Sequence, residues 1–275
     1  MNEKDLPVMG RRGLIASLGT AAAGELIVSV TPSVAAAPTV TEGKPIQERA
    51  PSILVFDINE TTLDIDHTAP VFQRVFGDKA VLREWFAQLV LYSNAITLAG
   101  PYATFFELGV GVLKMLADIH RVSLKPSDID ELRNRFQTMP PHPDVVQGLT
   151  ELKGQGFRLI AFTNSPPVKP TPAENAGLYK FFEREFSIDR VRRFKPAAQC
   201  YHMVAEELGV EMADCGMVAA HVWDTLGAQA AGFSGGALIT RGVNAPLRVA
   251  NIPQPQIVVP DFVALAAETA KVWRQ

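Results

Sequence analysis

The chain has 275 residues, of which 47% are hydrophobic and 20% charged, and its formal net charge is −3. A chain of this size can bury one large core, and the lack of basic runs excludes an electrostatic surface for nucleic acid or an anionic membrane. The expected partner is therefore a small molecule.

The first 37 residues differ in composition from the rest of the chain. Arg11 and Arg12 precede a weakly apolar, Ala- and Gly-rich stretch that ends in small residues, which is typical of a twin-arginine export signal with cleavage near Ala36. A membrane anchor is the alternative, but Glu25 interrupts the stretch before 18 apolar residues are reached. The sequence therefore predicts a signal over 1–37, a periplasmic or secreted protein and no stable membrane span.

A polar linker, residues 38–51, leads into the first predicted strand. This strand is the segment SILVFD, residues 52–57, a short β-branched run of the kind found in sheets that are covered on both faces. Ligands bind outside the carboxyl ends of such strands. Asp57, the last residue of the run, is therefore a candidate for chemistry.

Residues 66–139 carry the apolar periodicity of helices. The helical segments cover 80–100, 104–122 and 126–139, the last with Ser127 as its predicted N-cap. We therefore predict a helical cap domain over 66–139, inserted into a core domain formed by 52–65 and 140–275.

The second half of the chain alternates between helix and strand. Helices are predicted over 143–156, 173–182, 197–209, 225–232 and 261–273, and strands over 157–164, 186–190, 216–224, 236–241 and 256–260. Repeated units of this kind predict an α/β fold with a doubly wound, mostly parallel, Rossmann-like sheet.

Four polar groups follow predicted strands or lie in the loops beside them. They are Asp57, the pair Thr163-Asn164, Lys195 and Asp224. Because ligand sites of such sheets lie at the carboxyl edge, we expect these side chains to converge on one site. A carboxylate beside an ammonium stays ionised and can act as a nucleophile. Asp57 is the predicted nucleophile, with Lys195 as its partner.

This order of residues resembles the haloacid dehalogenase superfamily, whose core carries a nucleophilic aspartate, a Ser or Thr, a lysine and an acidic residue, with a helical cap after the first motif. The resemblance covers about residues 52 to 265. It implies that Thr163 and Asn164, together with backbone N–H groups of the turn at Glu60 and Thr61, donate hydrogen bonds to the charge that develops during the reaction.

The segment WDTLGA, residues 223–228, resembles more closely the type II (L-2-) haloacid dehalogenases. Thr61, four residues after Asp57, and Tyr201, after Lys195, also occupy that group's positions. The resemblance implies a hydrolase in which Asp57 displaces halide from a small halogenated organic acid and forms an aspartyl ester. It implies no metal and no cofactor.

Asn59 supports this interpretation on chemical grounds. In the phosphatases of the superfamily, the residue two positions after the nucleophile is an aspartate that protonates the leaving group, which an asparagine cannot do. A halide needs no proton to leave. A phosphatase or another hydrolase on the same fold, and a non-catalytic periplasmic binding protein, stay open as alternatives.

His221 and its neighbours depart from the type II pattern. Ala219 and His221 stand where that group has a serine and an asparagine. His221 either orients or activates the hydrolytic water, which Asp224 also helps to position, or it only fills space at the strand end.

The cap lacks the arginine that holds the substrate carboxylate in that group. Matching its Gln-Leu pair to residues 88–89 puts Trp85 at the arginine's position, with Arg83 as the nearest replacement. The candidate substrate-binding residues are therefore Asn59, Arg83, Trp85 and Phe86. The departure places a simple 2-haloalkanoate substrate in doubt.

Two further expectations concern thiols and assembly. Cys200 and Cys215 form no CxxC or zinc pattern and are expected to be buried thiols. The oligomeric state is not fixed by the sequence, and a homodimer is the assembly that we consider.

Overall fold

The structure is a computed structural model that describes residues 49–274. The predicted export signal (1–37) and most of the predicted linker lie outside the described residues. Within them, no helix combines the length and the apolar character that a membrane span requires.

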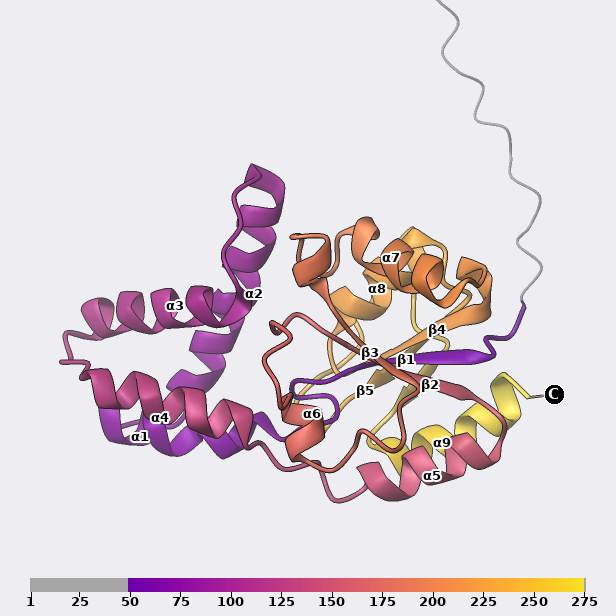
Figure 1. Ribbon diagram of the computed structural model, residues 1–275, viewed down its shortest axis with the longest axis horizontal. Helices are drawn as coiled ribbons and strands as arrows, with labels where there is room; N and C mark the ends of the chain where they lie inside the picture. The colour runs from indigo at the N-terminus through magenta and orange to yellow at the C-terminus, as the bar shows by residue number, and fades with distance from the viewer. Residues whose placement is uncertain (1–48, 275) are drawn as a thin grey trace, which may run out of the picture. The chain divides into compact units, whose positions relative to one another are not determined.

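A six-stranded parallel sheet forms the centre of the core (Figure 1). Its order is β3-β2-β1-β4-β5-β6, and every adjacent pair is parallel. The strands are β1 (Ile53–Asp57), β2 (Arg158–Thr163), β3 (Arg184–Ser187), β4 (Cys215–Ala219), β5 (Gly235–Ile239) and β6 (Ile257–Val259). The predicted doubly wound α/β fold is confirmed.

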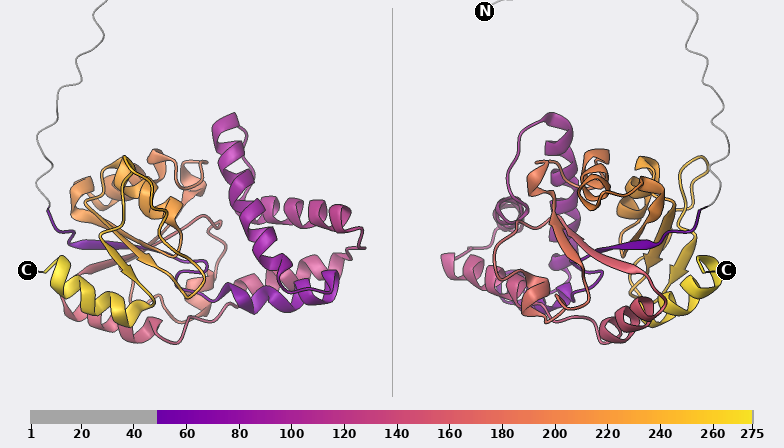
Figure 2. Two further views of the ribbon diagram at one scale, coloured as in Figure 1. Left: turned by 180° about the vertical axis from the view of Figure 1, so that it is seen from behind. Right: turned by 45° about the vertical axis from the view of Figure 1, so that its right-hand side comes forward.

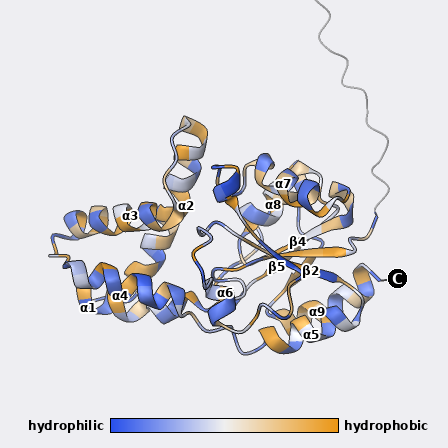
Figure 3. Cartoon of the chain, viewed as in Figure 1, coloured by the Kyte–Doolittle hydropathy of each residue, from blue (hydrophilic) through white to orange (hydrophobic). Residues whose placement is uncertain are grey.

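Helices cover both faces of this sheet, which explains why its central strands are almost entirely apolar. All residues of β1, β4 and β5 are buried, and Figure 3 shows the central strands mainly in hydrophobic colours. One face carries α5 (Val145–Gly154) and α9 (Phe262–Val272), and the other carries α7 (Ala198–Leu208) and α8 (Val222–Ala231) (Figures 1 and 2).

The cap is formed by the segment between β1 and α5. It contains η1 (Ile65–Thr68), α1 (Ala69–Phe76), α2 (Val81–Ala99), α3 (Phe105–His120) and α4 (Pro126–Gln137). Its interior is aromatic, with Trp85 packed against Phe72, Phe86 and Phe136. Thr104 caps α3 through a reciprocal pair of hydrogen bonds with Glu107. The domain boundaries at 65/66 and 139/140 stay a prediction.

The predicted helix over 173–182 is much shorter in the structure. α6 covers only Pro172–Asn175. Gly177 has a φ of +71°, and the N–H of Leu178 donates to the carbonyl of Ala173, so the chain leaves the helix in a left-handed turn that glycine favours. A short 3-10 helix, η2 (Ile188–Arg190), also replaces the end of the strand predicted over 186–190.

Two helix starts differ from the prediction. Residues 222–224 were expected in a strand, but α8 begins at Val222, after a short 3-10 helix, η3 (Met212–Asp214), and β4. Asp224 therefore lies in the first helical turn. In α4 the N-cap is Lys125 and not Ser127, because Pro126 takes the first helical position and Asp128 accepts a hydrogen bond from the Lys125 N–H.

Candidate active site

The polar residues predicted at the strand ends meet at the carboxyl edge of the sheet. Asp57 and Thr163 are the last residues of the neighbouring strands β1 and β2. Lys195 lies in the loop before α7, and Asp224 in the first turn of α8. Asp57, Lys195 and Asp224 are all buried. The structure therefore brings together the three charged residues that the sequence singled out.

Lys195 bridges the two aspartates. Its Nζ lies 2.9 Å from Asp57 Oδ1 and 2.6 Å from Asp224 Oδ2. Burial alone would lower the pKa of Lys195, but the two carboxylates outweigh it and raise that pKa. Burial alone would raise the pKa of Asp57, but the charges of Lys195 and His221 and the hydrogen bond from Thr61 lower it well below its ordinary value. Asp57 is therefore ionised at neutral pH.

Thr61 fixes the second oxygen of Asp57. Its hydroxyl donates to Asp57 Oδ2 at 2.6 Å and accepts from the Ala220 N–H at 2.8 Å. This geometry depends on the turn after β1, in which Glu60 has a left-handed φ of 67°. Thr61 thus ties the nucleophile to the end of β4.

Asp224 is hydrogen-bonded to Lys195 and Tyr201. It does not line the small space beside Asp57 that is described below. Its Oδ1 accepts from the Tyr201 hydroxyl at 2.7 Å, and its Oδ2 accepts from Lys195. A Cβ on Gly227 would lie 2.4 Å from Pro196 and 2.8 Å from the Tyr201 oxygen, so only glycine allows this close packing. The expected role of Asp224 in positioning water has no support in this geometry, because both of its oxygens are engaged elsewhere.

His221 lies on the other side of Asp57 and pairs with Glu60. Its Nε2 is 2.8 Å from Glu60 Oε2, and its Nδ1 is 3.4 Å from Asp57 Oδ2. Burial opposes the charged imidazole, but the close, negatively charged carboxylates of Asp57 and Glu60 raise the pKa of His221 to about 9. The rings of Phe86 and Trp223 pack at 5.4 and 5.0 Å from the imidazole. His221 is thus a fixed, protonated group in the resting site.

The side chain of Glu60 is the main feature that sequence reasoning missed. Only its backbone N–H was considered, although a carboxylate three residues after the nucleophile was a visible signal. Burial would raise the pKa of Glu60, but the hydrogen bond and charge of His221 and the charge of Arg83 lower it. Its partner in the fold, His221, is 161 residues away in the sequence, so their pairing was not visible there.

Arg83 does not occupy the position expected of a substrate clamp. Its guanidinium is bonded to Glu60 and, at 2.9 Å, to Asp66. Arg83 lines neither of the two cavities described below. The charge of Arg83 is thus engaged by Glu60 and Asp66, and its expected role in place of the missing cap arginine stays a prediction.

A very small space lies directly beside Asp57. Its volume is about 10 Å³. The lining residues are Asp57, Asn59, Phe86, Phe105, Asn164, His221 and Trp223. Asn59 and Phe86, two of the predicted substrate-binding residues, are therefore next to the nucleophile.

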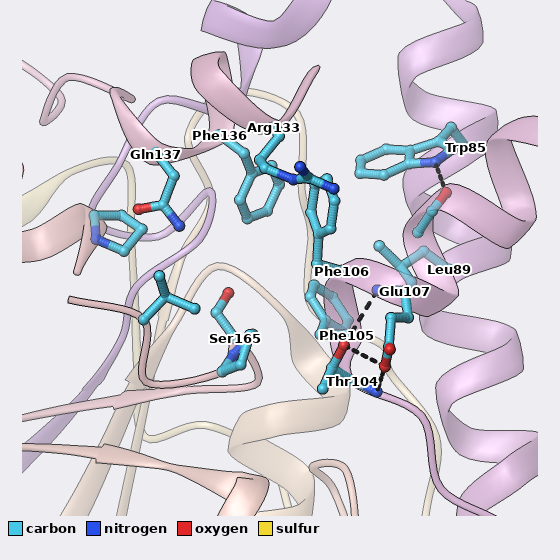
Figure 4. A pocket seen from close by; sticks show the side chains of 14 residues that line it. Trp85, Leu89, Thr104, Phe105, Phe106, Glu107, Arg133, Phe136, Gln137 and Ser165 are labelled. Atoms are coloured by element: carbon cyan, nitrogen blue, oxygen red, sulfur yellow. Dashed lines mark hydrogen bonds between the residues drawn. The ribbon is translucent and has the colours of Figure 1, made fainter. Parts of the chain in front are cut away.

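A larger cavity, of about 330 Å³, lies between the cap helices and the loop after β2. Figure 4 shows the rings of Trp85, Phe105, Phe106 and Phe136 around it, with Ser165 of the core nearby. The Trp85 Nε1–H donates to the Gly109 carbonyl at 2.8 Å, so its ring presents an apolar face. Phe105 lines both this cavity and the small space at Asp57.

Thr163 and Asn164 hold the loops around the site together. The Thr163 hydroxyl accepts from the Ser165 N–H at 3.0 Å, and Asn164 Oδ1 accepts from the Lys195 N–H at 3.1 Å. Of the two, only Asn164 lines the small space at Asp57. Its predicted role as a donor to developing charge stays a prediction.

The described residues offer neither a cluster of metal ligands nor a reactive thiol. Within residues 49–274, no group of three or more His, Cys, Asp or Glu side chains is arranged to hold a metal ion. Cys200 and Cys215 are both free and buried, and burial raises the pKa of each thiol to about 12. Neither thiol is therefore poised as a nucleophile.

Comparison with known proteins places this arrangement in a family. A family model described as haloacid dehalogenase-like hydrolase matches residues 51–232. An (S)-2-haloacid dehalogenase of Xanthobacter autotrophicus is 29% identical over 185 residues, which are 66% of this chain and 72% of that protein. An (S)-2-haloacid dehalogenase 1 of a Pseudomonas species is 27% identical over 207 residues, 73% of this chain and 88% of the other.

Solved structures agree at the level of the fold. The L-2-haloacid dehalogenase of Xanthobacter autotrophicus, with chloropropionic acid covalently bound, has a TM-score of 0.71 and 24% identity, and the match covers 81% of this chain and 99% of that one. Since the family model spans most of the core, the cap and the residues around Asp57, the chain belongs to the haloacid dehalogenase-like hydrolases.

Proposed function

We propose that this protein is a dehalogenase that hydrolyses the carbon–halogen bond of a small halogenated organic acid through an ester on Asp57. The observation that carries the proposal is the buried, ionised Asp57, held by Lys195 at 2.9 Å, with Asn59 in place of a proton-donating acid. A nucleophile without such an acid can expel only leaving groups that depart as stable anions. The names of the curated relatives support the same chemistry.

In the first step, a carboxylate oxygen of Asp57 attacks the carbon that carries the halogen. The carbon–oxygen bond forms as the carbon–halogen bond breaks, and the halide leaves with the electron pair. Phe86, Phe105 and Trp223 surround this point with apolar surface, which reduces the hydration of the attacking carboxylate. The larger aromatic cavity next to it suits the hydrocarbon part of an organic halide.

In the second step, water attacks the Asp57 carbonyl carbon with His221 as the base. His221 is protonated while Asp57 is an anion, but ester formation removes that anion and with it part of the stabilisation of the imidazolium. The pKa of His221 then falls, His221 releases its Nδ1 proton to the solvent, and Nδ1, which faces Asp57, can accept a proton from water. Glu60 holds the Nε2–H and keeps the ring in place.

A substrate panel tests the proposal. Protein that lacks residues 1–37 should release halide from acids such as 2-chloropropionate, which ion chromatography measures. The Asp57→Asn variant should reduce the rate of halide release on the order of 10⁶-fold, as loss of a nucleophile does in other enzymes. Phosphomonoesters with and without magnesium serve as the comparison. Metal-dependent phosphate release that matches or exceeds halide release would instead support a phosphatase.

We also propose export by the twin-arginine route, on the basis of Arg11, Arg12 and the small residues near Ala36. The N-terminus of protein from the periplasmic fraction should begin near residue 37, and replacing both arginines by lysine should keep the full-length chain inside the cell.

A homodimer is a further proposal, supported by an apolar surface on α2. Leu91 and Leu98, seven residues apart, are 56% and 90% exposed, and exposed apolar side chains on one helix face favour association. Sedimentation of the wild type beside a Leu91→Lys/Leu98→Lys variant tests this assembly.

A further inference from the structure

Two buried polar atoms of residues that line the small space beside Asp57 form no hydrogen bond within residues 49–274. They are Asn59 Oδ1 and His221 Nδ1, and the contact of His221 Nδ1 with Asp57 Oδ2, at 3.4 Å, is an ion pair. Both residues are at most 8% exposed, and both line the space of about 10 Å³. A space of this size holds about one water molecule, and buried polar atoms normally require such a partner.

The amide of Asn59 is held so that its oxygen is available to this space. Its Nδ2 donates to Ser165 Oγ at 3.0 Å. Ser165 is itself fixed, because its N–H donates to Thr163 and its carbonyl accepts from the Ser187 hydroxyl at 2.7 Å. The core loop after β2 therefore sets the direction of the Asn59 carbonyl.

We propose that Asn59 Oδ1 and His221 Nδ1 together bind the water that hydrolyses the Asp57 ester. Asn59 is then a catalytic residue of the second step, and not the substrate-binding residue expected from the sequence. This inference rests on the proposed ester route. It assigns a positive function to the asparagine, beyond the loss of an acid.

The two acceptor atoms can orient the attacking water through its two hydrogens. One hydrogen points to Asn59 Oδ1 and the other to His221 Nδ1, which leaves an oxygen lone pair free for the Asp57 carbonyl carbon. As the new C–O bond forms, the proton moves to Nδ1. The tetrahedral intermediate then breaks the bond to the substrate oxygen, which takes the proton from His221 and leaves as the alcohol. The second proton of the water remains on the new Asp57 carboxyl group and passes to His221, which restores the Asp57 carboxylate and the protonated imidazole.

A neutral hydrogen-bond acceptor suits position 59, because two carboxylates already lie close to His221. Asp57 and Glu60 both face His221, and Lys195 neutralises only the former. An aspartate at position 59 would add a third carboxylate to this buried group, which is costly unless it takes up a proton. An amide oxygen orients the water without this cost.

Rapid-quench kinetics on Asn59→Ala separate the two steps. Halide release in the first turnover should stay within about threefold of the wild type, while ester hydrolysis should slow on the order of 100-fold because the nucleophilic water loses its orientation. The alkylated protein should then accumulate, visible by intact mass as the protein plus the dehalogenated carboxyalkyl group. First-turnover halide release that falls as far as steady-state turnover would show that Asn59 binds substrate, and would overturn the inference.

Two further variants test the role of the Asn59 amide independently of Asn59→Ala. Ser165→Ala leaves Asn59 in place but frees its amide, and should slow ester hydrolysis about tenfold, the effect of one lost hydrogen bond. Asn94→Ala is the matched control: its Oδ1 is also buried and unpartnered within the described chain, but it lines neither cavity, and both steps should be unchanged. Unaltered ester hydrolysis in both Asn59→Ala and Ser165→Ala would contradict the inference.

Failure of the assignment of Asn59 can be told apart from failure of the proposed ester route. If the wild type released no halide and formed no ester with any acid of the panel, the ester route itself would fail. If the wild type forms and hydrolyses the ester but Asn59→Ala does so equally fast, only the assignment of Asn59 fails.

Discussion

Asp57 has a different basic group on each of its two carboxylate oxygens. On one side, Lys195 contacts Oδ1 and is shared with the fully buried Asp224. On the other side, His221 faces Oδ2 and is shared with Glu60, which also pairs with Arg83 of the cap. Both sides place a cation between two carboxylates.

The difference lies in what happens when Asp57 loses its charge. Lys195 keeps a full partner in Asp224 and, with its high intrinsic pKa, stays protonated throughout the proposed reaction. His221 keeps only Glu60, whose charge is already shared with Arg83, so its pKa falls toward neutrality. The lysine side can therefore hold the nucleophile, while the histidine side can exchange a proton.

Removal of Lys195 should have the largest effect on stability. Lys195→Met leaves Asp57 and Asp224 as buried carboxylates without their cation, and breaking such a pair costs about 3–5 kcal/mol. Urea unfolding at pH 7 measures this loss. The double variant Lys195→Met/Asp224→Asn should recover part of it, because one of the two charges is removed, and equal stability of Lys195→Met and wild type would contradict the described role of the lysine.

The pH dependence of stability tests the histidine side. The folded-state pKa of His221 is raised from 6.5 to about 9, so its protonation stabilises the folded protein fully below about pH 6.5, and this contribution is lost as the pH rises through about 9. A shift of this size corresponds to roughly 3 kcal/mol. The difference in unfolding free energy between wild type and His221→Gln should follow this curve between pH 6 and 10, and a flat difference would show that folding does not raise the pKa of His221.

Arg83→Met should give the smallest effect. Without the guanidinium, the charge of Glu60 acts more fully on His221, so the pKa of His221 rises and the acidic limb of ester hydrolysis moves to higher pH. The shift should be less than about one pH unit, because the Arg83 side chain is 41% exposed and solvent screens such pairs. Arg74→Met is the matched control, since among the described residues Arg74 forms ion pairs only with Asp128 and Glu131 of the cap, and the variant should leave the pH–rate profile unchanged.

The sequence predicted the lysine side well and the histidine side poorly, for physical reasons. Asp57, Lys195 and Asp224 follow the order of strands in a parallel sheet, and the carboxyl ends of such strands meet at one edge. The pairing of Glu60 with His221 depends on the left-handed turn at Glu60 and on a contact across 161 positions. No local pattern encodes that contact.

The same distinction applies to the fold. The sheet, its order of elements and the long cap helices follow from periodicity over many residues. The short α6 depends on a single residue, Gly177, whose left-handed turn overrides the apolar pattern around it. Likewise, the position of Arg83 depends on Glu60 and Asp66, which compete for its charge.

The most direct test of the ester on Asp57 is a single turnover in ¹⁸O-water with enzyme in excess over a halogenated acid. Since the product should take its hydroxyl oxygen from Asp57, the released hydroxy acid should carry little ¹⁸O, and mass spectrometry of the peptide that contains Asp57 should find the heavy oxygen there. Heavy oxygen in the product after this first turnover, with an unlabelled Asp57 peptide, would show that water attacks the substrate directly and would contradict the account.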